Sequence, residues 1–233
     1  MDRKSPTYRS LLTAVLAIFM GPVLAAPNQA VRIGVVEGIP REIAVSEGHL
    51  VGRFSSFYNC VFDSLSMPLR FQKMPLAQIL YQLKKGRLDV GLPLVQTEER
   101  DEYAEFGGRL FQTEYVYLLL DNLPPLDQTP GLTYSFIRRF VGEQLLLGEG
   151  AKMLAVSEWK QAVDMLKLGR ADVVIIPWVL LQPLMSDFKG QYFVRPAVWV
   201  DISLYVSHLS GDKTLAEKLR ANVRRCRYRN DQN

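Results

Sequence analysis

Two residues that could contact a bound molecule, Glu37 and Trp178, lie just beyond apolar runs that predict buried strands. Glu37 directly follows the run 31–36, and Trp178 lies two residues beyond the run 173–176. In α/β folds, ligands bind outside the carboxyl ends of parallel strands. Glu37 could therefore accept a hydrogen bond from a ligand cation, and Trp178 could stack on a ligand. Both also have ordinary explanations, because a lone loop carboxylate is usually solvated and a tryptophan often belongs to a core.

The sequence carries no pattern for a metal or a cofactor. Its two histidines are His49 and His208, and no cluster of Cys, His and carboxylate residues occurs at metal-ligand spacing. Its two cysteines, Cys60 and Cys226, could form a disulfide in an oxidising compartment or remain two separate buried thiols. Cys226 continues the apolar stripe of the last predicted helix, and Cys60 lies in the predicted helix 54–65.

A short segment occurs twice, 83 residues apart. Residues 78–90 are QILYQLKKGRLDV and residues 161–173 are QAVDMLKLGRADV, with seven identities in thirteen positions. Each copy predicts an amphipathic helix that ends at a glycine, followed by a charged turn and an apolar strand. Two similar α/β lobes in one chain would place a cleft between them, where ligands bind. Chance similarity is the alternative, because helix, glycine and strand follow one another in many α/β proteins.

The remaining apolar patterns place further strands and helices around this repeat. Residues 132–150 are the exception, and no boundaries are predicted there. Predicted strands cover 31–36, 69–72, 90–95, 111–121, 173–176 and 192–206, and predicted helices include 54–65 and 212–227.

The N-terminus predicts a secreted protein. A basic segment precedes the apolar stretch 11–24, and Val23-Leu24-Ala25 fits a cleavage site, so we expect a signal peptide at residues 1–25 and a periplasmic location. No second apolar stretch is long enough to span a bilayer. Removing three cations and one anion with the signal peptide lowers the formal net charge from +4 to +2. This balance gives no reason to expect a nucleic-acid partner.

Together these features resemble the family 3 extracellular solute-binding proteins, the periplasmic receptors of polar amino acid ABC importers. The resemblance runs from about residue 31 to residue 227. Its most specific pieces are GHLVG at 48–52, LKKGRLD at 83–89, TEER at 97–100 followed by Glu105-Phe106, and the second repeat at 166–172.

The resemblance implies an α/β fold of the type II periplasmic-binding-protein kind. In that family two lobes are joined by two crossing strands and close on a ligand by a hinge motion. For this chain it implies a first lobe at 26–120 and 198–233 and a second, shortened lobe at 121–197.

The resemblance also implies a ligand-binding role for Arg100. In the family, the arginine of the Thr-x-x-Arg element grips the carboxylate of the ligand, and a planar guanidinium is suited to that contact. Thr97 and the start of the helix that follows it would assist, and Gln96 completes the implied set. The alternative is that Arg100 pairs with neighbouring acidic residues on a solvated face.

The chain departs from the family pattern in the pocket. Pro177 occupies the position where family members usually hold the ligand ammonium with an aspartate, and Pro93-Leu94-Val95 replaces small hydroxyl residues. An aromatic residue that often covers the ligand is missing near Met74 and at 37–39. We therefore expect weak or no binding of ordinary α-amino acids.

The favoured hypothesis is a periplasmic solute-binding protein without enzymatic activity. It would capture a small polar solute carrying a carboxylate in the inter-lobe cleft for an ABC permease, as a monomer and without a cofactor. Two alternatives stay open. One is a cyclohexadienyl dehydratase-like enzyme that uses Glu37 for proton transfer. The other is a degenerate or sensory binding protein that contacts an envelope sensor protein.

Overall fold

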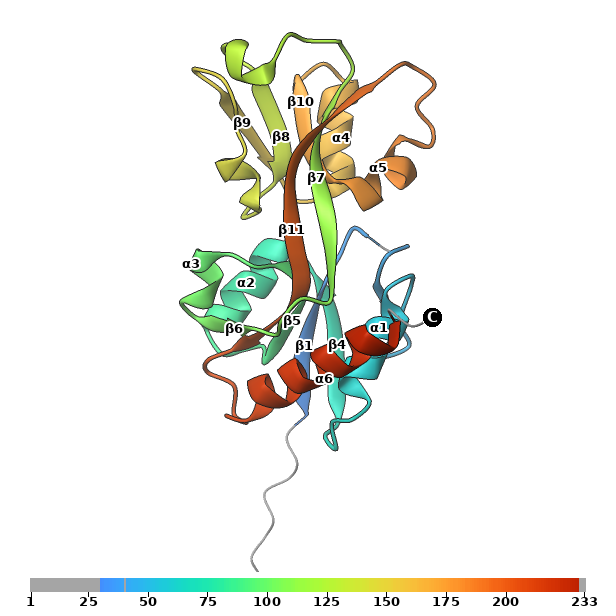
Figure 1. Cartoon of the computed structure of the whole chain (residues 1–233), viewed down its shortest axis with the longest axis vertical. Coiled ribbons are helices and arrows are strands. Elements are labelled where there is room, and N and C mark those ends of the chain that lie inside the picture. Colours follow the sequence, from blue (N-terminus) through green and yellow to red (C-terminus); the bar gives the residue numbers. More distant parts are fainter. Residues whose placement is uncertain (1–29, 40, 231–233) are drawn as a thin grey trace, which may run out of the picture.

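The chain folds into two lobes joined by two long strands. The computed structural model describes residues 30–39 and 41–230, so the predicted signal peptide lies outside the described residues. The joining strands, β7 (Phe111–Leu119) and β11 (Phe193–Ser207), pair antiparallel and run side by side from one lobe to the other (Figure 1). The predicted two-lobed α/β fold is confirmed.

The first lobe is built on three parallel strands in the order β4-β1-β5, which β11 then joins antiparallel. A short strand, β6, pairs with the C-terminal end of β11. The elements of this lobe are β1 (Val31–Val36), β2 (Ala44–Ser46), β3 (His49–Val51), α1 (Ser55–Phe62), β4 (Leu69–Met74), α2 (Leu76–Lys84), β5 (Val90–Val95), α3 (Glu98–Asp101), β6 (Ala104–Phe106) and α6 (Leu215–Asn230).

The second lobe repeats this arrangement with fewer elements. Its parallel strands follow the order β9-β8-β10, and β10 pairs antiparallel with β7. A short 3₁₀ turn stands between β8 and β9, where the first lobe has a hairpin and α1 between β1 and β4. The elements are η1 (Leu126–Gln128), β8 (Thr133–Ile137), η2 (Val141–Gln144), β9 (Lys152–Val156), α4 (Trp159–Lys167), β10 (Val173–Pro177) and α5 (Trp178–Met185).

The sequence repeat corresponds to equivalent helix–strand units, α2–β5 and α4–β10. In each unit the aspartate just before the strand forms hydrogen bonds with the first parallel strand of its lobe. The backbone N–H of Asp89 donates to the carbonyl of Arg32 (2.9 Å), and Asp172 does the same to Thr133 (2.9 Å). The carboxylates of Asp89 and Asp172 accept hydrogen bonds back from the N–H groups of those strands, at 2.9 and 2.7 Å. The repeated aspartate thus connects the turn before β5 to β1 in the first lobe, and the turn before β10 to β8 in the second.

The two repeat glycines give a matched pair of substitutions. Gly86 (φ 64°) and Gly169 (φ 66°) both end their helices in the left-handed region. A Cβ at Gly169 would meet no atom within 4 Å, whereas a Cβ at Gly86 would lie 2.7 Å from Cβ of Leu209. We expect Gly169→Ala to cost about 1 kcal/mol of unfolding free energy and Gly86→Ala to cost more, because it adds a clash to the backbone strain. Urea denaturation measures both, and equal losses would contradict this reading.

The last helix, α6, packs on α1 in the first lobe, where the structure joins Cys60 and Cys226 in a disulfide. Their Cα atoms are 6.0 Å apart. The side-chain amide of Asn222 donates to the carbonyl of Val61 (2.9 Å) beside this bridge. Among residues 30–39 and 41–230, no helix has both the length and the apolar character needed to cross a bilayer.

Candidate ligand-binding cleft

A cavity of about 80 Å³ lies between the lobes. Both lobes and both joining strands contribute to its lining, which is mostly aliphatic and aromatic. Among the described residues that line it, Glu42 and Arg100 carry charge, and Thr113 and Tyr115 carry hydroxyl groups. A ligand in this cavity would therefore meet two charged groups within a largely apolar enclosure.

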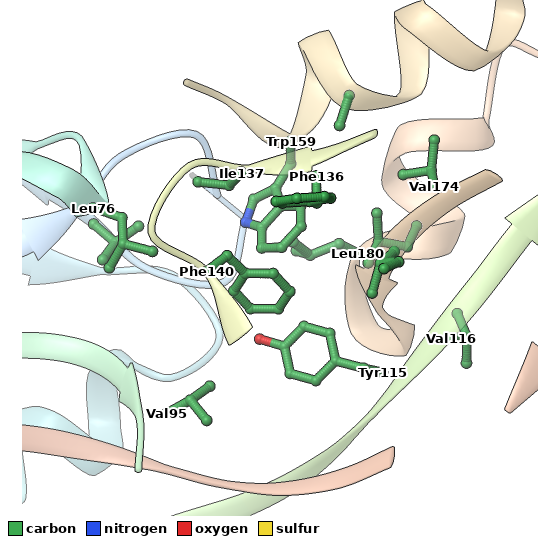
Figure 2. Close-up of a cluster of buried hydrophobic side chains, with 14 of the residues drawn as sticks. Leu76, Val95, Tyr115, Val116, Phe136, Ile137, Phe140, Trp159, Val174 and Leu180 are labelled. Atoms are coloured by element: carbon green, nitrogen blue, oxygen red, sulfur yellow. The ribbon is translucent and has the colours of Figure 1, made fainter. Parts of the chain in front are cut away.

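Three aromatic rings pack together on the second-lobe side of the cavity. Phe140 lies between Tyr115 of β7 and Trp159 at the start of α4, with ring-centroid distances of 4.6 and 4.9 Å. Figure 2 shows these rings together, with Leu76 and Val95 of the first lobe to one side of them. The rings are all buried. They supply aromatic surface to the lining of the cavity from positions that the family pattern did not indicate.

Arg100 is buried in this cleft, with only 4% of its surface exposed. Thr97 caps the short helix α3, because its hydroxyl accepts a hydrogen bond from the backbone N–H of Arg100 (3.3 Å). The guanidinium donates from Nη1 to the carbonyl of Val95 (2.5 Å). Burial lowers the pKa of Arg100, and the nearby hydroxyls of Tyr103, Tyr205 and Tyr115 oppose this shift. An arginine remains charged despite such a shift, so the cleft holds a buried cation.

The guanidinium of Arg100 also links the two lobes. Its Nη2 donates to the backbone carbonyl of Arg139 in the second lobe (3.2 Å). The exposed side chain of Arg139 in turn lies 3.7 Å from the carboxylate of Glu99. Because a guanidinium has five N–H donors, its bonds to Val95 and Arg139 leave donors that a carboxylate could use.

Glu42 is the second charged group of the cavity, and sequence reasoning did not find it. Its surface is 6% exposed, and its Oε2 atom is buried without a hydrogen-bond partner. The backbone is fixed on both sides, since its N–H donates to Ile39 and its carbonyl accepts from Phe54. A single acidic residue in a loop carries no spacing signal, so this burial could not be read from the sequence.

The other predicted site residues do not line this cavity. Gln96 is exposed and donates to the carboxylate of Asp101 (3.2 Å), and Thr97 acts as the helix cap described above. Glu37 lines a separate, wider cavity of about 300 Å³ together with Lys73 and Glu158. Trp178 is 53% exposed, although its neighbours Pro177 and Val179 line the cleft. Of the five predicted residues, the structure brings only Arg100 to this cavity.

Trp178, which the sequence places just beyond a buried strand, belongs to a helix. Pro177 ends β10 and Trp178 is already the first residue of α5, so no loop separates them. The helix turns the Trp178 ring toward solvent, as its exposure shows. Among the described residues, no group of three or more His, Cys, Asp or Glu side chains could hold a metal ion.

Solved structures with the same fold include a substrate-binding protein of an amino acid ABC transporter and arginine-binding proteins. A substrate-binding protein of an amino acid ABC transporter has a TM-score of 0.72 at 15% identity, covering 87% of this chain and 95% of its own. An ancestral arginine-binding protein bound to arginine has a TM-score of 0.72 at 19% identity, covering 87% and 94%. The arginine-bound form of truncated ArgBP from T. maritima has a TM-score of 0.69 at 19% identity, covering 83% and 94%.

No protein-family model matches the chain, and a comparison with curated proteins finds no match. At identities below 25%, the likeness to solved structures establishes the two-lobed fold alone.

Proposed function

We propose that the protein is a periplasmic solute-binding protein that holds a small carboxylate-bearing solute between its lobes for an ABC importer. The proposal rests on one observation. Arg100 is buried in the inter-lobe cavity, and its two hydrogen bonds to backbone carbonyls leave other N–H donors of the guanidinium for a ligand. A guanidinium enclosed by apolar side chains binds a carboxylate more strongly than one in water, because the surrounding dielectric is low. Structural relatives that bind amino acids support the same reading.

The two joining strands suggest how a solute would enter. A cavity of about 80 Å³ offers little room, so the lobes would have to part to admit a ligand. Proteins with two lobes and few connections part by a hinge at those connections, here β7 and β11. On closing, Arg139 and the aromatic rings of the second lobe would return to the Arg100 side and exclude water.

One observation supports the alternative of a degenerate or sensory protein. Arg100 already bonds to backbone carbonyls of both lobes, which could hold the lobes closed without a solute. In that case the closed form would itself be the surface presented to an envelope sensor protein. The dehydratase alternative has less support, because Glu37, the residue that would transfer the proton, lies at a cavity that does not include Arg100.

Substitution of Arg100 tests the proposal directly. We expect Arg100→Gln to weaken binding of any carboxylate-bearing solute on the order of 100-fold, because a charged pair in a buried site is lost. The measurement is isothermal titration against a panel of amino acids and organic acids. Arg87→Gln, which removes an exposed arginine of the same lobe, is the matched control and should leave binding unchanged.

Three outcomes would count against this function. A solute that binds wild type and Arg100→Gln equally would remove Arg100 from the site. Recovery of the bound solute as a chemically changed product would contradict a binding protein and favour an enzyme. A panel that gives no binding at all would favour the closed, degenerate form.

A further inference from the structure

Arg139 has a backbone conformation that favours glycine. Its φ is 65°, and among the described residues other than glycine only Glu47 is also in the left-handed region. Glu47 belongs to the tight turn of the β2–β3 hairpin, where such angles are required. Arg139 is the third residue of the turn after β8, in which the N–H of Phe140 donates to the carbonyl of Ile137 (3.1 Å). Because a Cβ is strained at that position, the arginine costs stability that a glycine would not.

Both polar parts of Arg139 contact the other lobe. Its carbonyl accepts a hydrogen bond from Nη2 of Arg100 (3.2 Å), and its guanidinium lies 3.7 Å from the carboxylate of Glu99. Glu99 and Arg100 are adjacent residues of α3 in the first lobe. Ile137 and Phe140, at the ends of the turn, line the inter-lobe cavity, whereas the side chain of Arg139 is 65% exposed. The strained turn therefore meets α3 at the rim of the cavity, with a buried hydrogen bond inside and an ion pair outside.

We propose that Glu99, Arg100 and Arg139 form a latch that holds the two lobes together in the absence of a solute. Closing the empty cleft encloses the cation of Arg100, and the carbonyls of Val95 and Arg139, one from each lobe, then accept its hydrogen bonds. The exposed pair of Arg139 with Glu99 adds a modest attraction that salt weakens. The open form is then the minor one, and a solute enters only when the latch opens. This inference does not depend on which solute the cleft binds.

The three tryptophans of the chain provide a reporter of closure. Trp159 lines the cavity and is 5% exposed, whereas Trp178 and Trp199 are 53% and 64% exposed. In a protein that carries Trp178→Phe and Trp199→Phe, tryptophan fluorescence comes from Trp159 alone. Parting of the lobes uncovers the wall to which Trp159 belongs, so the rate of acrylamide quenching measures opening. The protein is first dialysed from urea with its disulfide intact, which removes any solute that was purified with it.

Three changes to the latch should raise the quenching rate at least about twofold, the size expected when an exposed ion pair is lost. They are Arg139→Gly, Glu99→Gln and, in wild type, addition of about 0.5 M NaCl. Arg139→Gly should also melt within about two degrees of wild type or higher, because relief of strain offsets the greater freedom of the unfolded chain. Arg138→Gln is the matched control. Arg138 is exposed, and its side chain donates to the carbonyl of Ala155 in its own lobe (3.4 Å), so the quenching rate should not change.

A charge exchange tests the pair itself. Glu99→Arg and Arg139→Glu should each raise the quenching rate, and the protein with both changes should return to the rate of wild type. A double variant that remains open would overturn the latch, as would an Arg139→Gly protein that is quenched no faster than wild type.

Two further outcomes would also overturn the proposal. If Trp159 of the solute-free wild type is quenched as fast as an exposed tryptophan, the lobes are open without a solute. If Arg139→Gly melts several degrees below wild type, the arginine stabilises the turn itself. Titration of solutes against Arg100→Gln is a separate measurement, so failure of the latch would leave the proposed function standing.

Discussion

Replacing Cys60 and Cys226 by alanine is expected to lower the free energy of unfolding by ~5 kcal/mol in the chain-entropy treatment. The bridge joins residues 166 positions apart, so it restricts a very long loop of the unfolded chain. Opening it frees the whole region between α1 and α6 to expand on unfolding. Urea denaturation of non-reduced protein measures the loss, and the same experiment on reduced wild type should give a similar value.

Single substitutions provide the control for the disulfide. Either Cys60→Ala or Cys226→Ala removes the bridge completely, so each should cost nearly as much as the double variant. Additive losses, with each single variant near half of the double, would show that packing of the sulfur atoms rather than the cross-link stabilises the protein. Since the bridge lies within the first lobe, away from β7, solute binding measured below the melting temperature should be unaffected.

The backbone of the first lobe was largely predictable because its strands have strong local signals. The boundaries of β1 and β5 agree with the predicted runs 31–36 and 90–95, which are apolar stretches bounded by polar turns. The stripe that includes Cys226 also indicated correctly that α6 covers apolar surface. Helix ends were less accurate, because α1 spans Ser55–Phe62 rather than 54–65. The ends of an isolated helix depend on caps and tertiary contacts that periodicity does not record.

The segment 132–150 could not be predicted, and it supplies part of the cleft. Its strand β8 has five residues, four of them buried, and its remaining structure is a 3₁₀ turn and loops. Phe140 follows this strand and is fixed by rings from β7 and α4, far away in the sequence. The carbonyl of Arg139, at φ 65°, reaches Arg100 in the other lobe. Such contacts between lobes leave no periodic pattern in the sequence.

The site itself was predictable only where a motif carried it. Arg100 was located by the resemblance, and the structure places it in the cleft. Glu37 and Trp178 were chosen because they follow strands, a rule that gives the correct edge of the sheet but not the direction of a side chain. Glu42 was missed because its burial depends on the hairpin and on the closure of the lobes around it.

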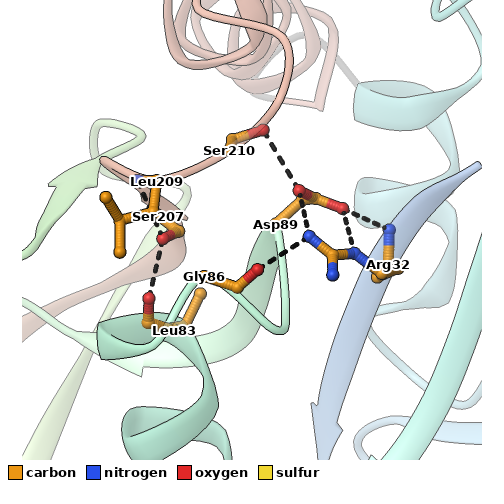
Figure 3. Close-up of polar contacts among 7 residues, drawn as sticks. All are labelled: Arg32, Leu83, Gly86, Asp89, Ser207, Leu209 and Ser210. Carbon is orange, nitrogen blue, oxygen red and sulfur yellow. Dashed lines mark hydrogen bonds and ion pairs between the residues drawn. The ribbon is translucent and has the colours of Figure 1, made fainter. Parts of the chain in front are cut away.

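The second large effect on the free energy of unfolding is expected at the repeated aspartates, because Asp89 is buried and Asp172 is exposed. Asp89 accepts hydrogen bonds from Nε and Nη2 of Arg32 and from the hydroxyl of Ser210 (Figure 3). Asp172 is exposed and accepts from the N–H of Thr133. We expect Asp89→Ala to cost about 3–5 kcal/mol, because it leaves the partly buried cation of Arg32 without its carboxylate partner. Asp172→Ala should cost about 1 kcal/mol. Equal losses, measured by urea denaturation, would contradict this difference.

The same contacts make the first lobe sensitive to acid. Burial alone raises the pKa of Asp89, but hydrogen bonds and charge from Arg32 outweigh it and leave the pKa below its ordinary value. A carboxylate whose pKa is lowered by folding stabilises the protein fully above its unfolded pKa of about 4, and this contribution disappears as pH falls through the folded value. Wild type should therefore lose more stability than Asp89→Asn between pH 5 and pH 2. Parallel losses in the two proteins over this range would show that other carboxylates govern acid unfolding.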